Sequence, residues 1–211
     1  MGKILCYDFT VSTEMDKQMI KKVSLVVIPI IIVIGLFIYL LNSLQGNVIP
    51  ADFTAARQNA AAISQDIVNL TNETSKKIES ANQAENDGNM DQLTNLISDA
   101  KTTNAIAYQK AFDLSKSIQQ MAGSLNGVQS TRQQLGYEAI ATELSLISEF
   151  LSYTESLNDF LNNASKSASD ESSINQKATA DALNRVNEKV NSINDYNKNF
   201  LDKMAAFDQA N

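Results

Sequence analysis

The sequence predicts an all-α fold, in which a single N-terminal transmembrane helix is followed by an antiparallel up-down-up-down four-helix bundle with coiled-coil-like packing. Two observations predict it. Residues 23–41 form an apolar run of 19 residues without a charge. From Asp52 onward there is no proline, and apolar residues recur at steps of 3 and 4, the spacing of helices that pack along a seam.

The apolar run predicts an uncleaved signal-anchor. At ~1.5 Å rise per residue it reaches close to the ~30 Å of a bilayer's hydrocarbon core. The alternative is a cleaved secretory signal, whose apolar stretch is ~7–15 residues long and ends in a small-x-small site. Residues 40–46, Leu-Leu-Asn-Ser-Leu-Gln-Gly, contain no such site. The bilayer is therefore the first expected partner.

Positive charge predicts the orientation of the span. Lys17, Lys21 and Lys22 crowd its N-terminal side, whereas the first basic residue after it is Arg57. Because Lys and Arg mark the cytoplasmic flank, residues 1–22 are expected in the cytoplasm. The C-terminal domain is then extracytoplasmic on a single-pass protein of the cell membrane. Whether the chain starts at Met1, Met15 or Met19 stays open.

Composition argues against several chemistries. After residue 41 the chain has 13 Lys and Arg against 21 Asp and Glu, and such an acidic surface repels nucleic acid. There is no His, the commonest general base and metal ligand, and the single cysteine, Cys6, precedes the span. We therefore expect no enzyme, no cofactor and no metal in the bundle.

Four long helices are expected after a hinge at residues 42–50, which contains Gly46 and Pro50. A domain of about 160 residues is large enough for a core of its own. Its breaks fit capping boxes, in which side chains satisfy free N–H groups of the first turn: Asn89…Gln92, Ser130…Gln133 and Ser173…Gln176. A polar loop is expected at 164–172. The predicted helices span approximately 52–85, 90–122, 131–163 and 174–208.

Four polar residues occupy positions on the apolar stripes: Thr74, Asn104, Thr154 and Asn197. Single polar residues in a coiled-coil seam fix the register at some cost in stability. A register role is therefore the preferred interpretation, and a polar pocket inside the bundle is the alternative.

The third helix carries more apolar surface than one seam requires. This interpretation leaves two alternatives open: the helix is the most buried of the four, or a second apolar face binds another copy or another membrane protein. The residues are Leu146, Phe150, Tyr153, Leu157 and Phe160. The carboxylates of the same helix are expected on a solvated face: Glu138, Glu143, Glu149, Glu155 and Asp159.

Asn69, Asn72 and Asn163 begin sequons for glycosylation, and whether any is modified stays open. With one N-terminal span and a helical ectodomain, the chain resembles in architecture the four-helix ligand-binding modules of chemoreceptors and the LemA-like proteins. The resemblance carries no motif, so it assigns no functional residue.

Two functions follow from these features. The first is a non-enzymatic interaction or structural component of the cell envelope, bound to other membrane or envelope proteins or to further copies of itself. The alternative is a ligand-sensing ectodomain that signals through a partner, because a tail of ~20 residues is too short to fold into an output domain.

Overall fold

The computed structural model describes residues 49–169 and 173–210 of the chain. Within these residues the fold is all-α, with four helices packed against one another and no strand, which confirms the predicted all-α bundle and leaves the predicted transmembrane helix untested. The helices are α3 (Ala51–Asn86), α4 (Met90–Gly123), α5 (Ser130–Ser169) and α6 (Ser173–Gln209).

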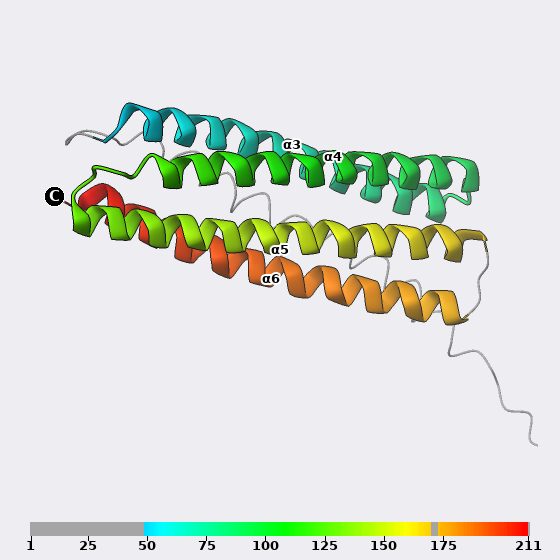
Figure 1. Ribbon diagram of the computed structural model, residues 1–211. Coiled ribbons are helices and arrows are strands. Elements are labelled where there is room, and N and C mark those ends of the chain that lie inside the picture. The colour runs from blue at the N-terminus through cyan, green and yellow to red at the C-terminus, as the bar shows by residue number, and fades with distance from the viewer. Residues whose placement is uncertain (1–48, 170–172, 211) are drawn as a thin grey trace, which may run out of the picture.

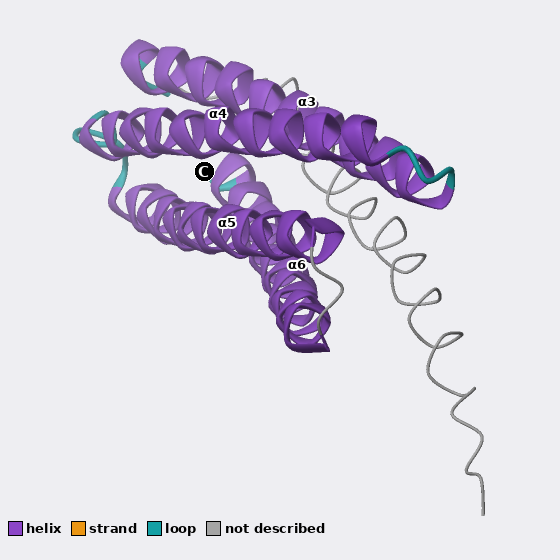
Figure 2. Cartoon of the chain, turned by 90° about the vertical axis from the view of Figure 1, so that its right-hand side faces the viewer, coloured by secondary structure: helices purple, strands orange, loops and turns teal. Residues whose placement is uncertain are grey.

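The helices alternate in direction and lie in two layers. Figure 1 shows that α3 begins and α6 ends at the same end of the bundle. In Figure 2, α3 and α4 form one layer and α5 and α6 form the other. The backbones approach most extensively within each of these two hairpins, and less between α4 and α5. The fold is thus two helical hairpins packed face to face.

The predicted span at residues 23–41, the hinge at 42–48 and the three lysines Lys17, Lys21 and Lys22 lie outside the described residues. Among the helices that the structure does describe, none combines the length and the apolar character needed to cross a bilayer. The membrane segment therefore stays a prediction from the sequence.

The turn between α3 and α4 follows from its glycine and its asparagine. Gly88 adopts a φ of 70°, where a side chain would be strained, and the Asn89 N–H donates back to the Ala84 carbonyl at 2.8 Å. Asn89 then caps α4, since its Oδ1 accepts from the Gln92 N–H at 3.1 Å. Asn89 Nδ2 also donates to Gln92 Oε1 at 3.0 Å, so both residues of the expected capping box are engaged.

The capping box expected at Ser130…Gln133 is wrong. The Gln133 N–H donates to the Gln129 carbonyl at 2.8 Å, and its side-chain amide reaches the Leu125 carbonyl at 3.2 Å. The Gln133 side chain therefore bonds to the loop before α5 instead of capping the helix as the pattern predicted. The side chains of the third box, Ser173…Gln176, lie outside the described part of the chain.

The expected loop at 164–172 is also too long, because α5 continues to Ser169. These extra turns are packed on α6. Asn163 Nδ2 donates to the Ala178 carbonyl at 3.3 Å, and the Ser167 and Thr179 hydroxyls lie 3.2 Å apart. Since the segment contains no Pro or Gly, these contacts suffice to keep it helical.

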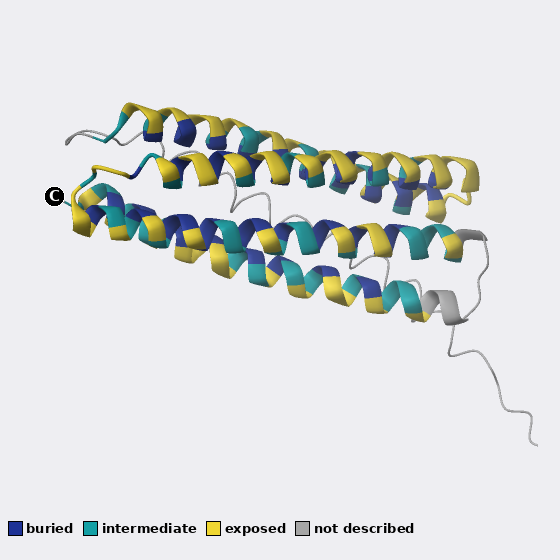
Figure 3. Ribbon diagram, viewed as in Figure 1, coloured by how far each residue is buried: buried dark blue, intermediate teal, exposed yellow. Residues whose placement is uncertain are grey.

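The core runs the length of the bundle between the layers. Figure 3 shows exposed residues on the outer sides of α3 and α4 and buried ones on the sides that face other helices. The two hairpins fill the core differently: α3 and α4 contribute most of the buried alanines, and α5 and α6 contribute most of the buried aromatic residues. Buried alanines of the first hairpin include Ala56, Ala60, Ala81, Ala100, Ala107 and Ala111, and large residues of the second include Phe150, Tyr153, Leu157, Phe160, Phe200 and Phe207.

Candidate functional site

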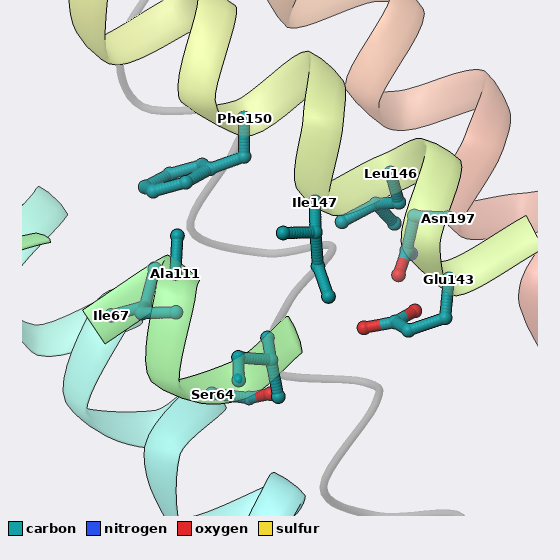
Figure 4. Close-up of a pocket in the computed structure, with 9 residues that line it drawn as sticks. Ser64, Ile67, Ala111, Glu143, Leu146, Ile147, Phe150 and Asn197 are labelled. Atoms are coloured by element: carbon teal, nitrogen blue, oxygen red, sulfur yellow. The ribbon is translucent and has the colours of Figure 1, made fainter. Parts of the chain in front are cut away.

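A small cavity lies in the middle of the bundle, where all four helices meet. Figure 4 shows the Glu143 carboxyl directed from α5 into this space. The volume is about 20 Å³, just above the ~10–15 Å³ that one water molecule requires. We call it the mid-bundle cavity, and its lining is Ser64 and Ile67 of α3, Ala111 and Leu114 of α4, Glu143, Leu146, Ile147 and Phe150 of α5, and Asn197 of α6.

Glu143 is the unusual residue of this site. It is 3% exposed, and its Oε2 has no hydrogen-bond partner within the part of the chain that the structure describes. Burial raises the pKa of the Glu143 carboxyl from its ordinary value of 4.5 to about 8, because a charge is costly in an apolar interior. Among the described residues, no other charged side chain lines the cavity. With the cavity empty, the carboxyl is therefore mostly neutral near pH 7.

Two uncharged polar side chains share the cavity with this carboxyl. Ser64 is 3% exposed and Asn197 is 2% exposed, and they come from α3 and α6, on either side of the gap between the hairpins. The remaining six lining residues are apolar. The cavity therefore presents three polar side chains from three helices inside an otherwise apolar shell.

The prediction that Glu143 lies on a solvated face is wrong. The other four carboxylates of that set are exposed or half-buried, as expected: Glu138, Glu149, Glu155 and Asp159. The spacing contains the signal that was missed, since Glu143 lies three residues after Ile140 and four before Ile147, both of which are buried. That spacing places the three on one face of the helix.

The polar stripe residues are all buried, between 1% and 5% exposed: Thr74, Asn104, Thr154 and Asn197. Asn104 Nδ2 of α4 donates to the Thr154 carbonyl of α5 at 2.7 Å, which links the two hairpins. The Thr74 and Thr154 hydroxyls donate to their own helices, at the Leu70 and Leu151 carbonyls. The structure thus brings Asn197 to the mid-bundle cavity and leaves the other three outside its lining.

The expectation of a second, exposed apolar face on α5 has to be corrected. All five residues proposed for it are between 1% and 7% exposed and belong to the interior: Leu146, Phe150, Tyr153, Leu157 and Phe160. The physical reason is that the large side chains of α5 fill the space beside the small ones of α3 and α4. The alternative interpretation, a deeply buried third helix, is the one that fits the burial.

A second cavity of about 70 Å³ lies towards the end of the bundle where α3 turns into α4. Its lining includes Ile78, Asn82 and Glu85 of α3, with Phe160 and Leu161 of α5. Partial burial raises the pKa of the Glu85 carboxyl. This tip cavity is the larger of the two, but Glu85 is exposed, so its carboxylate can remain hydrated.

The opposite end of the bundle is closed by a charged and aromatic cluster, which we call the base cluster. Arg57 of α3 and Asp208 of α6 form a two-pronged ion pair, with N–O distances of 2.9 and 3.0 Å. The rings of Phe53 and Phe207 lie 5.2 Å apart, and the Arg132 guanidinium lies 5.9 Å from the Phe207 ring centre. The first and last helices are therefore bound together at the base.

Comparisons of the chain with protein families, curated proteins and solved structures found no match. Within residues 49–169 and 173–210, no three Asp, Glu, Cys or His side chains gather where they could hold a metal ion. Function must therefore be inferred from the geometry and the sequence of this chain alone.

Proposed function

We propose that the protein is a membrane-anchored helical bundle that acts outside the cytoplasm by binding other membrane or envelope proteins, without catalysing a reaction. The observation that carries the proposal is the position of the base. The predicted span ends at residue 41, ten residues before α3 begins. The start of α3 lies at the end of the bundle where α6 also ends (Figure 1). Four helices of 34 to 40 residues would then project from the membrane.

Length and surface support an interaction role. At ~1.5 Å per residue, helices of this size place the tip about 50 Å from the base. Several large apolar residues are exposed along the bundle and give partners a surface to contact: Met90, Ile106, Phe112, Tyr137 and Tyr196. The acidic excess of the chain beyond the span disfavours nucleic acid as the partner.

Topology is tested by labelling intact cells with a membrane-impermeant maleimide. Cys6, the single cysteine, is predicted to lie inside and provides the internal control. A cysteine introduced by Gln109→Cys, at an exposed position of α4, should be labelled while Cys6 is not. Labelling of Cys6 alone would show the opposite orientation, and labelling of both without cell lysis would exclude the span.

The interaction role is tested by photocrosslinking in membranes. A photoreactive residue placed at exposed position 106 or 112 should give a discrete heavier species, which mass spectrometry then identifies. The same residue at 118, which is buried, is the control and should give none. If the photoreactive residue is activated efficiently at every exposed position and only free monomer is recovered, the proposal that the bundle binds other proteins is wrong.

A ligand-sensing ectodomain is the second candidate, and the two cavities favour it. Each is lined from both hairpins, so an occupant would change how the hairpins pack. A small-molecule panel screened by thermal unfolding of the full chain tests this, since a ligand at 100 times its dissociation constant stabilises by about 2.7 kcal/mol. No shift with any compound would count against sensing and leave the interaction role standing.

A further inference from the structure

The mid-bundle cavity combines features that a merely structural polar layer does not need. Glu143 is 3% exposed, its Oε2 has no hydrogen-bond partner among the described residues, and its carboxyl points into the cavity. Elsewhere in the core, the buried Asn104 amide donates to the Thr154 carbonyl across the helices. A buried carboxylate without a cationic partner is strongly destabilising, so its ionised form requires something to compensate it.

The oxygens around the cavity suit a cation. Glu143 offers two carboxylate oxygens, Ser64 a hydroxyl oxygen and Asn197 an amide carbonyl. The charge also limits the choice, because a divalent ion beside one carboxylate would leave a net positive charge in an apolar shell. The volume of about 20 Å³ accepts a species of the size of one water molecule and excludes organic amines.

We propose that the mid-bundle cavity is a binding site for one water-sized monovalent cation, ammonium or potassium, with the ionised Glu143 carboxylate as its counter-charge. Ser64 and Asn197 complete the oxygen shell from the neighbouring hairpin and the neighbouring helix. The site holds three of the four helices through one ion. The described lining comes from the bundle, so the proposal does not rest on the predicted membrane segment.

Binding exchanges a proton for the cation. The empty carboxyl is protonated near neutral pH, so the O–H bond of the acid breaks, the proton leaves to the solvent, and the cation takes its place with no change in the net charge of the site. No other titratable group of residues 49–169 and 173–210 lines the cavity, since α3 contributes Ser64 and Ile67, α4 contributes Ala111 and Leu114, and α6 contributes Asn197. Occupancy therefore rises with pH and with cation concentration together.

The decisive measurement is the infrared C=O stretch of the protonated Glu143 carboxyl in the full chain. It is titrated in chloride salts of ammonium, potassium, sodium and tetramethylammonium at equal ionic strength. In tetramethylammonium, which is too large for the cavity, the band should disappear only near the intrinsic pKa. Above the dissociation constant of a bound cation, the apparent pKa should fall by about one unit for each tenfold rise in concentration.

Two variants assign the signal. Glu143→Gln removes the acid while preserving the shape, so both the band and any salt-specific shift in the thermal unfolding midpoint should vanish. Glu155→Gln alters an exposed carboxylate of the same helix and should retain both. Ser64→Ala keeps the carboxyl and should weaken cation binding several-fold, with the titration in tetramethylammonium unchanged.

The outcomes separate clearly. A fall in apparent pKa with ammonium or potassium, absent with tetramethylammonium and in Glu143→Gln, supports the site, and the two arms show which ion it prefers. An apparent pKa that is the same in all four salts means that the cavity holds water beside a neutral acid, which overturns the proposal. Neither result bears on crosslinking to a partner protein, so the two proposals fail independently.

Discussion

The base cluster and the mid-bundle cavity both bury charge-bearing side chains, and they treat that charge in opposite ways. At the base, the Arg57 side chain is 4% exposed and the Asp208 side chain is 18% exposed, and the two bond through both nitrogens and both oxygens. Glu143 is buried to a similar degree with no charged neighbour in its cavity. The charges of Arg57 and Asp208 compensate each other, whereas Glu143 avoids a buried charge by remaining protonated.

The difference teaches where a bundle of this kind can respond to its surroundings. At the base, the opposite charges of Arg57 and Asp208 compensate each other through two hydrogen bonds, so the pair needs no further ligand. A lone buried carboxyl changes its state when a proton leaves or a cation arrives. The base cluster therefore holds the first and last helices together, whereas the mid-bundle cavity can respond to a proton or a bound cation.

The largest expected effect is the pH dependence of the free energy of unfolding that Glu143 causes. Because the folded pKa of Glu143 is raised to about 8 from 4.5, its contribution to stability is fully present below pH 4.5 and is lost as the pH rises to 8. At ~1.4 kcal/mol per pKa unit, the loss in tetramethylammonium buffer is on the order of 5 kcal/mol. Urea unfolding at a series of pH values measures it.

Glu143→Gln should remove most of this slope and be more stable than the wild type above pH 8, whereas Glu155→Gln should follow the wild type. If the wild type and Glu143→Gln show parallel pH profiles, the carboxyl is solvated in the folded state and the cavity is not as closed as described.

The next largest effect is expected from removing the ion pair of the base cluster. Arg57→Met keeps most of the apolar stem and leaves Asp208 without its cation, so the free energy of unfolding at pH 7 should fall by about 3–5 kcal/mol. Chemical unfolding of the full chain measures the loss. The double variant Arg57→Met with Asp208→Leu should recover most of it, because two apolar residues can replace a buried pair. Equal losses in the single and double variants would assign the effect to packing.

Replacing a neutral buried group should have a smaller effect than either of these changes. Asn104→Leu removes the bond from Nδ2 to the Thr154 carbonyl, and it should lower the free energy of unfolding by about 1–2 kcal/mol. Thermal unfolding is sufficient to detect this. A much larger loss would mean that the Asn104 amide does more than satisfy one carbonyl, which would contradict the interpretation that it fixes the register at a cost in stability.

The smallest effect belongs to the ion pairs at the surface. Lys189 and Glu149 lie 2.9 Å apart with side chains that are 33% and 25% exposed. Lys189→Ala should change the free energy of unfolding by about 0.5 kcal/mol, because water and salt screen such a pair. A change comparable with that of Arg57→Met would contradict the contrast between the base and the surface.

Much of the fold could be predicted from the sequence, because seam periodicity and the Asn89 cap are local signals. Ser130…Gln133 has the same spacing as Asn89…Gln92, but the Gln133 side chain donates to the Leu125 carbonyl in the preceding loop. The spacing alone does not show that this carbonyl competes with the cap. The end of α5 likewise depends on bonds to α6.

The candidate site was harder to predict. Asn197 was recognised as a seam residue, and a polar pocket was one of its two interpretations. Glu143 was assigned to the surface because carboxylates are rarely buried without a partner. Its helical spacing to Ile140 and Ile147 places it on the buried face, and this position outweighs the usual preference of a carboxylate for the surface. In a bundle, position on the stripe was the better guide.

The shared end of the first and last helices has a practical consequence for any tagged form of this chain. A fluorescent reporter fused after α6 would sit beside the start of α3, a full helix length from the Gly88 turn, and would say little about events at the far end. An insertion into that turn would report from there. Joining the end of α6 to the start of α3 by a short linker, with new termini at Gly88, should give a circular permutant of the bundle in which α3 and α4 still pack together although no turn joins them.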